Sequence, residues 1–249
     1  MNGLFSIDKE TQVIFSPGNV RYDNGTFSFA RQQTAVYAAE NAEMFRSHID
    51  LFQITNEGEV LTYRNDNVTD SFSQWKESLT DDWFIPSVSQ WKFLLSERNA
   101  STVSGVENAR FIKCTVRGTA CLMLFPDDFT FPENVELPPK LRINDKVADF
   151  SKLMYDYVAM KSLEKAGCVL LPAIKWDWEN EYDYLSNRLH HGYDLLNAGR
   201  LTTGNYWASP IKKDDNNFHH FIFSSKHCQI GSHRQGLEYS AFMRLVSLR

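Results

Sequence analysis

Residues 204–209 (GNYWAS), 218–225 (FHHFIFSS) and 242–246 (FMRLV) decide the fold of the carboxy-terminal part of the chain. The apolar ends, Tyr206-Trp207 and residues 242–246, are typical of buried strands. Between them the sequence is rich in His, Lys, Asn, Ser and Gln, with one Cys and one Arg. Burial of so polar a run would contribute little stability. We therefore predict that residues 204–246 present a ligand-binding surface.

Length and composition place the chain among globular proteins. Its 249 residues, 43% of them hydrophobic and 23% charged, can bury a sizeable core. We find no internal repeat, low-complexity tract or linker, and we predict a single domain over residues 1–249. Aromatic residues make up 14%, which favours β structure and binding through ring faces. The net charge of −5 argues against nucleic acid as the main partner.

Charge is unevenly distributed. From Arg200 onward there are seven Lys or Arg residues and three Asp or Glu residues, a balance of +4 that leaves −9 for residues 1–199. Four of the seven His residues also lie in this segment. Two interpretations stay open, namely ordinary solvated charge or a patch that suits an anionic or polyhydroxylated partner.

Membrane and export signals are absent from the sequence. No run of about 18 apolar residues occurs, so we predict no membrane span. The amino terminus, residues 1–6 (MNGLFS), lacks a basic segment followed by an apolar one. Either the protein is not exported by that route or a leader has been removed.

Local patterns predict several elements along the chain. Residues 12–22 (QVIFSPGNVRY) predict a strand, a Pro-Gly turn and a second strand, and residues 26–30 another strand. Ser87 and Gln90 form a capping-box pattern before a helix that carries Val88, Trp91, Leu94 and Leu95 on one face. Further predicted elements are a hairpin over 111–125 turning at Arg117-Gly118, a helix over 157–166 capped by Asp156 and ended by Gly167, and a buried strand over 168–173. Residues 40–81 give mixed signals.

The four cysteines do not form a dense disulfide framework. Cys114 and Cys121 face each other across the predicted hairpin, at a spacing that does not exclude a bridge. We predict reduced thiols.

Five motifs in order resemble the C-type-lectin-like surface proteins of gut bacteria, a family related to the major paralogous domain and, more distantly, to formylglycine-generating enzymes. Residues 13–22 resemble the family's "V-Y-F-S-x-G-N-L-x-Y", and residues 82–95 are similar to "W-R-x-L-T-x-x-E-W-x-Y-L". Residues 118–128 resemble "N-G-V-A-G-L-I-L-L-P-D", and residues 163–173 resemble "M-E-A-A-G-A-V-F-L-P-A". Residues 204–209 with 241–246 resemble "G-Y-Y-W-S-S … Y-S-V-R-L-V".

The resemblance implies an α+β class with a C-type-lectin-like fold, in which two helices pack on small twisted antiparallel sheets and long carboxy-terminal loops display a ligand face. It also implies a place at the cell surface, in the extracellular space or on a virion. The sequence departs from the family mostly over residues 210–238, where His, Lys, Asp, Phe, Cys and Arg replace the usual Tyr, Ser and Asn. In related phage and bacterial proteins, diversity-generating retroelements vary this segment, and the mixture here resembles such a segment.

The leading hypothesis is a non-enzymatic adhesin or receptor-binding module. Its ligand would be a glycan or a protein on a cell surface, and the oligomeric state stays open. The predicted ligand-binding residues are Lys212, Asp214, Asn216, His219, Lys226, His227, Gln229, His233 and Arg234. We expect Trp207 and Arg244 to support the scaffold rather than touch the ligand.

Metal binding has weak support in the sequence. Adjacent His219 and His220 lie in a strand-like run and point to opposite faces, and no spacing with His227, Cys228 or His233 matches a structural zinc pattern. Residues 131–134 (FPEN) and 176–180 (WDWEN) resemble calcium motifs of true C-type lectins in the wrong order. We predict no cofactor, and the alternative is calcium held by oxygen atoms of Asp177, Glu179 and Asp183.

Two other classes of function remain as alternatives. A divergent enzyme of the formylglycine-generating type would use two nearby cysteines, whereas Cys228 stands alone in the carboxy-terminal segment. The remaining three cysteines lie in predicted core strands, and no Gly-rich phosphate loop occurs. The other alternative is a structural subunit of a surface or tail assembly.

Overall fold

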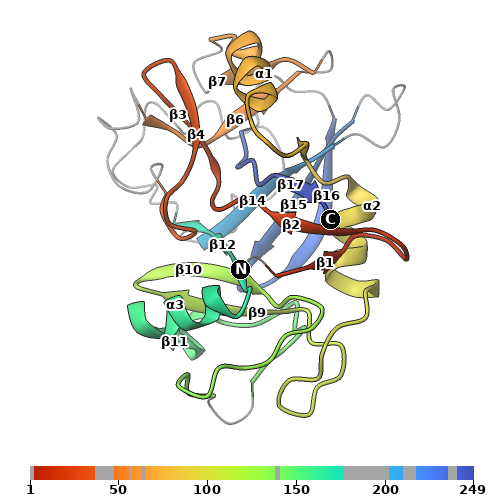
Figure 1. Cartoon of the computed structure of the whole chain (residues 1–249). Helices are drawn as coiled ribbons and strands as arrows, with labels where there is room; N and C mark the ends of the chain where they lie inside the picture. Colours follow the sequence, from red (N-terminus) through yellow and green to blue (C-terminus); the bar gives the residue numbers. More distant parts are fainter. Residues whose placement is uncertain are drawn as a thin grey trace.

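The computed structural model describes residues 3–36, 48–55, 58–62, 66–137, 141–175, 202–209, 217–234 and 240–249. These residues form a mixed α+β structure with three α-helices and several small sheets (Figure 1). The α+β class is therefore confirmed, although the described residues contain one α-helix more than the two predicted.

The first sheet joins the two ends of the described chain. Its strands lie in the order β1 (Phe5–Ser6), β2 (Gln12–Phe15), β17 (Val246–Leu248) and β8 (Trp83–Phe84), all antiparallel. The prediction of a strand over 242–246 is shifted along the chain, because the ladder begins only at Val246. Ala241 and Phe242 make isolated bridges instead, although both are fully buried.

The Pro-Gly turn after β2 is confirmed, but the strands on its two sides join different sheets. A second sheet has the order β4 (Thr26–Phe29), β3 (Val20–Asp23) and β5 (His48–Ile49). A two-stranded sheet follows, with β6 (Phe52–Ile54) and β7 (Val60–Thr62). At Gly18 a side chain would clash with the carbonyl oxygen of Ala30, which explains the glycine in the turn.

Helix α1 (Thr69–Glu77) was not predicted. Its N-cap residue, Val68, makes no side-chain capping hydrogen bond, so the usual sequence signal for a helix start is missing. The helix is held by tertiary packing: Phe72 and Trp75 contact Phe27 with ring centroids 5.2 and 5.8 Å away.

Helix α2 (Val88–Lys92) confirms the capping box and continues as a π-helical turn, η2 (Phe93–Glu97). The backbone N–H of Gln90 donates to Ser87 Oγ at 3.2 Å, and the N–H of Ser87 donates to Gln90 Oε1 at 2.7 Å. Trp91 and Leu94 are fully buried, as the helical spacing predicts.

The predicted hairpin at Arg117-Gly118 forms the centre of another sheet. The order is β11 (Met154–Tyr155), β9 (Phe111–Val116), β10 (Thr119–Leu124) and β12 (Val169–Pro172). Arg117 and Gly118 both have positive φ, as a tight two-residue turn requires. Cys114 lies opposite Cys121, and all four cysteines are free and buried, which confirms the prediction of reduced thiols.

Helix α3 (Tyr157–Lys165) follows the short 3-10 helix η3 (Phe150–Lys152). Asp156 caps α3 by accepting a hydrogen bond from the N–H of Ala159 at 2.8 Å. Gly167 has a φ of 91° just beyond the helix end, as predicted. Met160 and Leu163 are fully buried.

Two hydrophobic clusters lie on the two faces of the β9–β10 hairpin. Leu122 and Leu124 belong to the larger cluster, whose members run from the first strands of the chain to the last. Cys121 and Met123 belong to the smaller one, together with the inward residues of α3. Residues 121–124 of β10 are therefore buried on both faces.

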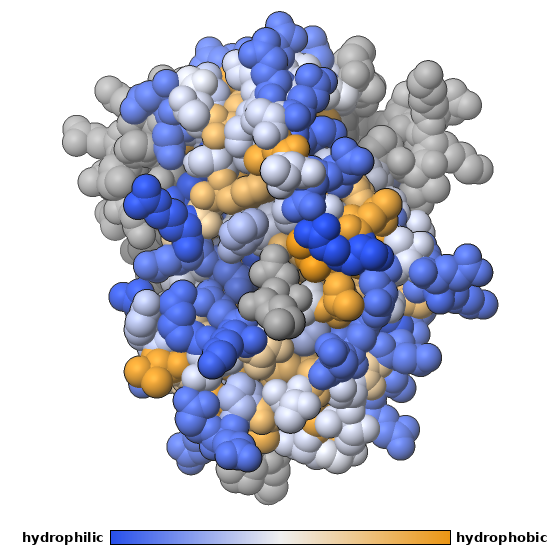
Figure 2. Space-filling view, in the orientation of Figure 1, coloured by the Kyte–Doolittle hydropathy of each residue, from blue (hydrophilic) through white to orange (hydrophobic). Residues whose placement is uncertain are grey.

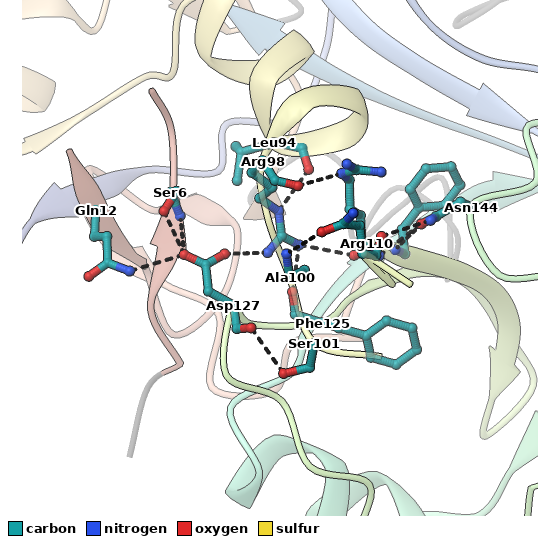
Figure 3. Close-up of polar contacts among 12 residues, drawn as sticks. Ser6, Gln12, Leu94, Arg98, Ala100, Ser101, Arg110, Phe125, Asp127 and Asn144 are labelled. Atoms are coloured by element: carbon teal, nitrogen blue, oxygen red, sulfur yellow. Dashed lines mark hydrogen bonds and ion pairs between the residues drawn. The ribbon is translucent and has the colours of Figure 1, made fainter. Parts of the chain in front are cut away.

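A buried arginine ties these parts together (Figure 3). The side chain of Arg98 has no exposed surface, and its Nη1 lies 2.5 Å from Oδ1 of Asp127. Its remaining donors reach main-chain carbonyls: Nε donates to Leu94 at 2.8 Å, and Nη2 to Phe125 at 2.5 Å and Arg110 at 3.1 Å. Because every nitrogen of the guanidinium has a partner, the charge can be buried here.

Asp127 carries the same network to the first sheet. Its Oδ2 accepts hydrogen bonds from the N–H of Ser6 at 2.8 Å, from Ser6 Oγ at 2.7 Å and from Gln12 Nε2 at 3.0 Å. Strands β1 and β2 are thereby fixed to the segment that follows β10.

Gln33 covers the outer edge of β12. Its Oε1 accepts from the N–H of Leu170 at 2.9 Å, and its Nε2 donates to the carbonyl of Cys168 at 3.2 Å. The same Oε1 accepts from Nη2 of Arg244 at 2.6 Å. Arg244 is 1% exposed, so it belongs to the scaffold as expected.

On the face of the molecule seen in Figure 2, hydrophilic side chains predominate and hydrophobic ones lie in small groups. The large hydrophobic residues that stand most exposed are Val147, Met154, Tyr157, Val158 and Leu248. Within the described part of the chain, no helix combines the length and the apolar character that a membrane crossing needs.

Candidate ligand-binding surface

The carboxy-terminal segment builds the last four-stranded sheet. Its order is β13 (Ile174–Lys175), β14 (Thr202–Ala208), β15 (Asn217–Ser224) and β16 (Cys228–Arg234), and β14, β15 and β16 lie side by side in Figure 1. Strands β15 and β16 form a hairpin whose two-residue turn is Ser225-Lys226. Over residues 217–234 the expected long loop is therefore a regular hairpin, and β16 was not predicted.

The register separates the side chains of this sheet into two faces. Residues directly opposite each other in an antiparallel pair share a face, and neighbours along a strand alternate. Trp207 lies opposite His220, and His220 lies opposite Gly231; we call their side the His220 face. Tyr206 lies opposite Phe221, and Phe221 lies opposite Ile230; we call this side the Phe221 face.

The Phe221 face anchors the sheet in the core. Tyr206, Phe221 and Phe223 are fully buried. The ring of Phe221 stacks on Trp91 of α2, with centroids 5.0 Å apart and planes 26° apart. The hydroxyl of Tyr206 donates to the carbonyl of Pro172 at 2.9 Å, which joins β14 to β12. These contacts make the sheet a rigid support.

Each face places one ring over a glycine of the neighbouring strand. A Cβ at Gly204 would clash with the ring of Phe223, and a Cβ at Gly231 would clash with the ring of His220. Glycine inside a strand often marks such a close approach. His220 is 2% exposed, so its ring is buried beside Gly231.

On the His220 face, buried and exposed side chains lie side by side. Trp207 is buried and donates from Nε1 to the carbonyl of Phe52 at 2.7 Å, so it supports the scaffold as expected. Ile222 is half-buried, and Gln229 opposite it is exposed. Lys226 in the turn is also exposed. Among the side chains whose burial the structure describes in this hairpin, the exposed ones are Lys226 and Gln229, at and near the turn.

The structure divides the predicted ligand-binding residues. His227, Gln229 and the register position of His233 lie on the His220 face, whereas His219 and the register position of Arg234 lie on the Phe221 face. His219 and the register position of Arg234 therefore lie on the face opposite to His227 and Gln229, because one-residue steps along a strand alternate faces. The ligand-binding role of these residues stays a prediction. Three further predicted residues, Lys212, Asp214 and Asn216, lie outside the described residues.

The turn is held by a small polar network. Ser224 Oγ accepts from the N–H of Lys226 at 3.1 Å and lies 3.1 Å from Nδ1 of His227. From strand β9, Lys113 Nζ donates to the carbonyls of His227 at 3.1 Å and Lys146 at 2.5 Å. Sequence reasoning missed Lys113; the only signal was a lysine within an otherwise buried strand.

Burial controls the titration of this network. It lowers the pKa of His227, and the nearby charge of Lys113 lowers it further. Burial also lowers the pKa of Lys113, against the opposing influence of Cys228 and Asp145. The imidazole of His227 is therefore neutral at pH 7 and can serve as a hydrogen-bonding group but not as a cation.

Metal and thiol chemistry find little support in the described residues. Among them, no group of three or more His, Cys, Asp and Glu side chains is placed to hold a metal ion. The calcium candidates Asp177, Glu179 and Asp183 lie outside the described residues. Burial raises the pKa of Cys228 to about 11, although Lys113 and Lys146 act in the opposite direction.

Comparison with protein-family models, curated proteins and solved structures found no match to this chain.

Proposed function

We propose that this chain is a non-enzymatic ligand-binding module with a C-type-lectin-like fold. Its ligand is a glycan or a protein on a cell surface, and its binding surface is the exposed part of the carboxy-terminal sheet. The resemblance of five motifs in order supports the fold. The α+β class and the small sheets agree with that resemblance.

The observation that carries the proposal is a polar hairpin on a rigid base. Phe221 and Phe223 fix β15 in the core, while Lys226 and Gln229 stand exposed beside it. A support that is already ordered loses little conformational entropy when a ligand binds. Polar side chains on such a support therefore suit recognition better than they suit stability.

The side-chain chemistry favours hydroxyl-rich or anionic groups. Gln229 offers an amide donor and acceptor, and Lys226 offers three donors with a positive charge. His219 and His227 add imidazole groups at the two sides of the hairpin. Residues 217–234 contain two Lys or Arg residues and no Asp or Glu residue, so an anionic partner meets no carboxylate there.

One observation bears on the enzymatic alternative. A formylglycine-generating type of reaction needs a reactive cysteine, but Cys228 is 4% exposed and its thiol is protonated at neutral pH. This favours binding over catalysis. The variant Cys228→Ala should keep wild-type binding, whereas loss of a measurable activity in that variant would favour the enzyme.

An array experiment tests the proposal. Wild-type protein and the double variant Lys226→Ala/Gln229→Ala are applied to arrays of glycans and bacterial surface proteins, with and without calcium. Both substituted residues are exposed, so folding should be unchanged. Lys165→Ala on α3 serves as a matched control, since it removes one exposed lysine elsewhere. A wild-type signal that only the double variant loses supports the proposal, and equal signals from all three proteins contradict it.

A further inference from the structure

Among the described strands, β16 stands at an end of its sheet. The N–H of Ser224 donates to the carbonyl of His227, which fixes the phase of the β15–β16 ladder. Main-chain groups of residues 229, 231 and 233 therefore face β15, and those of Cys228, Ile230 and Ser232 face outward. Within the described ranges, no residue hydrogen-bonds to these outward groups. Unpaired N–H and C=O groups along a strand are a template for another strand.

The other end strands differ from β16. They are two to four residues long, whereas β16 has seven residues. The edge of β12 is covered by Gln33, as described above. The side of β14 away from β15 pairs with β13 and with Phe242, whose carbonyl accepts from the N–H of Trp207 at 3.0 Å. Among the described strands, β16 thus combines an end position with length and an uncovered edge.

Charge indicates what kind of strand fits. Residues 217–234 carry Lys226 and Arg234 and no carboxylate, in a chain whose net charge is −5. A second copy of the same hairpin would bring like charges together, which disfavours self-pairing. An acidic segment would meet complementary charge instead.

The side chains beside the edge indicate the pattern of the partner. Ile230 is half-buried against the large hydrophobic cluster on the Phe221 face, and Gln229 is exposed on the His220 face. A paired strand would place every second residue beside Ile230 and the alternate residues in the polar surroundings of Gln229. Alternating apolar and acidic residues satisfy both faces.

We propose that an extended acidic polypeptide segment of a partner adds to β16 as a fifth strand of the sheet, pairing its main chain with Cys228, Ile230 and Ser232. This inference rests on the proposed function, since it names the partner class for the same hairpin. Main-chain pairing supplies the affinity, and the apolar and acidic side chains supply the specificity.

The test uses a blocked seven-residue peptide of alternating Glu and Val, measured by fluorescence anisotropy with the full chain. Ile230→Pro removes an outward N–H without removing a ladder hydrogen bond, and Ile230→Ala is the matched control for loss of the side chain. Two modified peptides complete the design. When the peptide runs antiparallel to β16 with its Val side chains on the face of Ile230, N-methylation of the Val amides blocks pairing with β16. N-methylation of the Glu amides then alters the far edge only.

The expected result is binding to wild type and weaker binding to Ile230→Ala, which loses a side-chain contact but keeps the outward N–H. Binding to Ile230→Pro should be at least about tenfold weaker than to Ile230→Ala because a hydrogen bond is also lost. The Val-methylated peptide and a Lys/Val peptide should bind wild type at least about tenfold more weakly than the Glu/Val peptide. The methylated peptides test the pairing even if Ile230→Pro fails to fold. No binding of the Glu/Val peptide, or equal binding of both methylated forms, would overturn the proposal.

Two further outcomes separate the inference from the proposed function. If the Lys226→Ala/Gln229→Ala variant fails to bind an array ligand that Ile230→Pro still binds, the proposed binding surface is supported and strand pairing is contradicted. A wild-type dimer in sedimentation equilibrium that Ile230→Pro abolishes would assign the edge to a second copy and reject the acidic partner.

Discussion

The ring of His220 lies directly over Gly231 of the neighbouring strand, where a side chain at position 231 would occupy the same space. Because His220 is 2% exposed, its ring has little room to move. The packing of the His220 face therefore requires a glycine at position 231.

Gly231→Ala should destabilise the protein by about 1–3 kcal/mol, the usual cost of overpacking. Urea unfolding followed by tryptophan fluorescence measures this cost. In the double variant His220→Ala/Gly231→Ala the clash is absent, so the added effect of the glycine substitution should largely disappear. An unchanged unfolding midpoint in Gly231→Ala would show that the ring does not fill this space.

Loss of the buried ion pair between Arg98 and Asp127 should destabilise the protein more than Gly231→Ala does. Asp127→Asn removes the negative charge and leaves the guanidinium of Arg98 buried without its counter-ion, which should cost about 3–5 kcal/mol. Arg98→Met removes the charge and keeps apolar volume, so adding it to Asp127→Asn should recover part of the loss. A cost below about 1 kcal/mol for Asp127→Asn would contradict a buried, water-excluded pair.

The side-chain amide of Gln33 should stabilise the protein through its hydrogen bonds to Leu170, Cys168 and Arg244. Gln33→Ala removes the partner of Leu170 N–H and of Arg244 Nη2, and an expected loss of about 1–3 kcal/mol follows from unsatisfied buried groups. Gln33→Glu keeps both acceptor contacts but replaces the donor to the Cys168 carbonyl by an oxygen. If urea unfolding at pH 7 gives Gln33→Glu and Gln33→Ala the same free energy of unfolding as wild type, Gln33 does not stabilise the edge of β12.

We expect the titration of His227 to make the folding stability of the protein depend on pH. Its pKa in the folded protein is lowered from the ordinary value of 6.5 by burial and by Lys113. The unfolded state therefore binds more protons below pH 6.5, and folding stability should fall as the pH falls from about 6.5 toward the folded pKa. His227→Gln should remove this part of the pH dependence. Urea unfolding between pH 5 and 8 measures both proteins, and parallel profiles would contradict the assignment.

Local signals in the sequence predicted the elements that carry their own caps and turns. Ser87 with Gln90 and Asp156 with Gly167 mark two helices, and Arg117-Gly118 marks a hairpin, because each feature is complete within a few residues. Helix α1 lacks a capping side chain and depends on distant Phe27, so its sequence gave no comparable signal.

The features that could not be predicted from the sequence depend on contacts between residues far apart along the chain. The shift of the last strand to Val246 is set by its partners Phe15 and Phe84, which are far away along the chain. The burial of Arg98 and Lys113 depends on carbonyl groups from other elements and has no local pattern. For the candidate site, alternation predicted that His219 and His220 face opposite sides, but only the register shows that Gln229 lies with His220.

The most direct test of the central claim is hydrogen–deuterium exchange of the full chain with and without a saturating ligand from the arrays. The account predicts that protection on binding is strongest within residues 217–234, with helix α3 unchanged. Protection concentrated on α3 or on the first sheet, with residues 217–234 unchanged, would contradict the assignment of the carboxy-terminal hairpin as the binding surface.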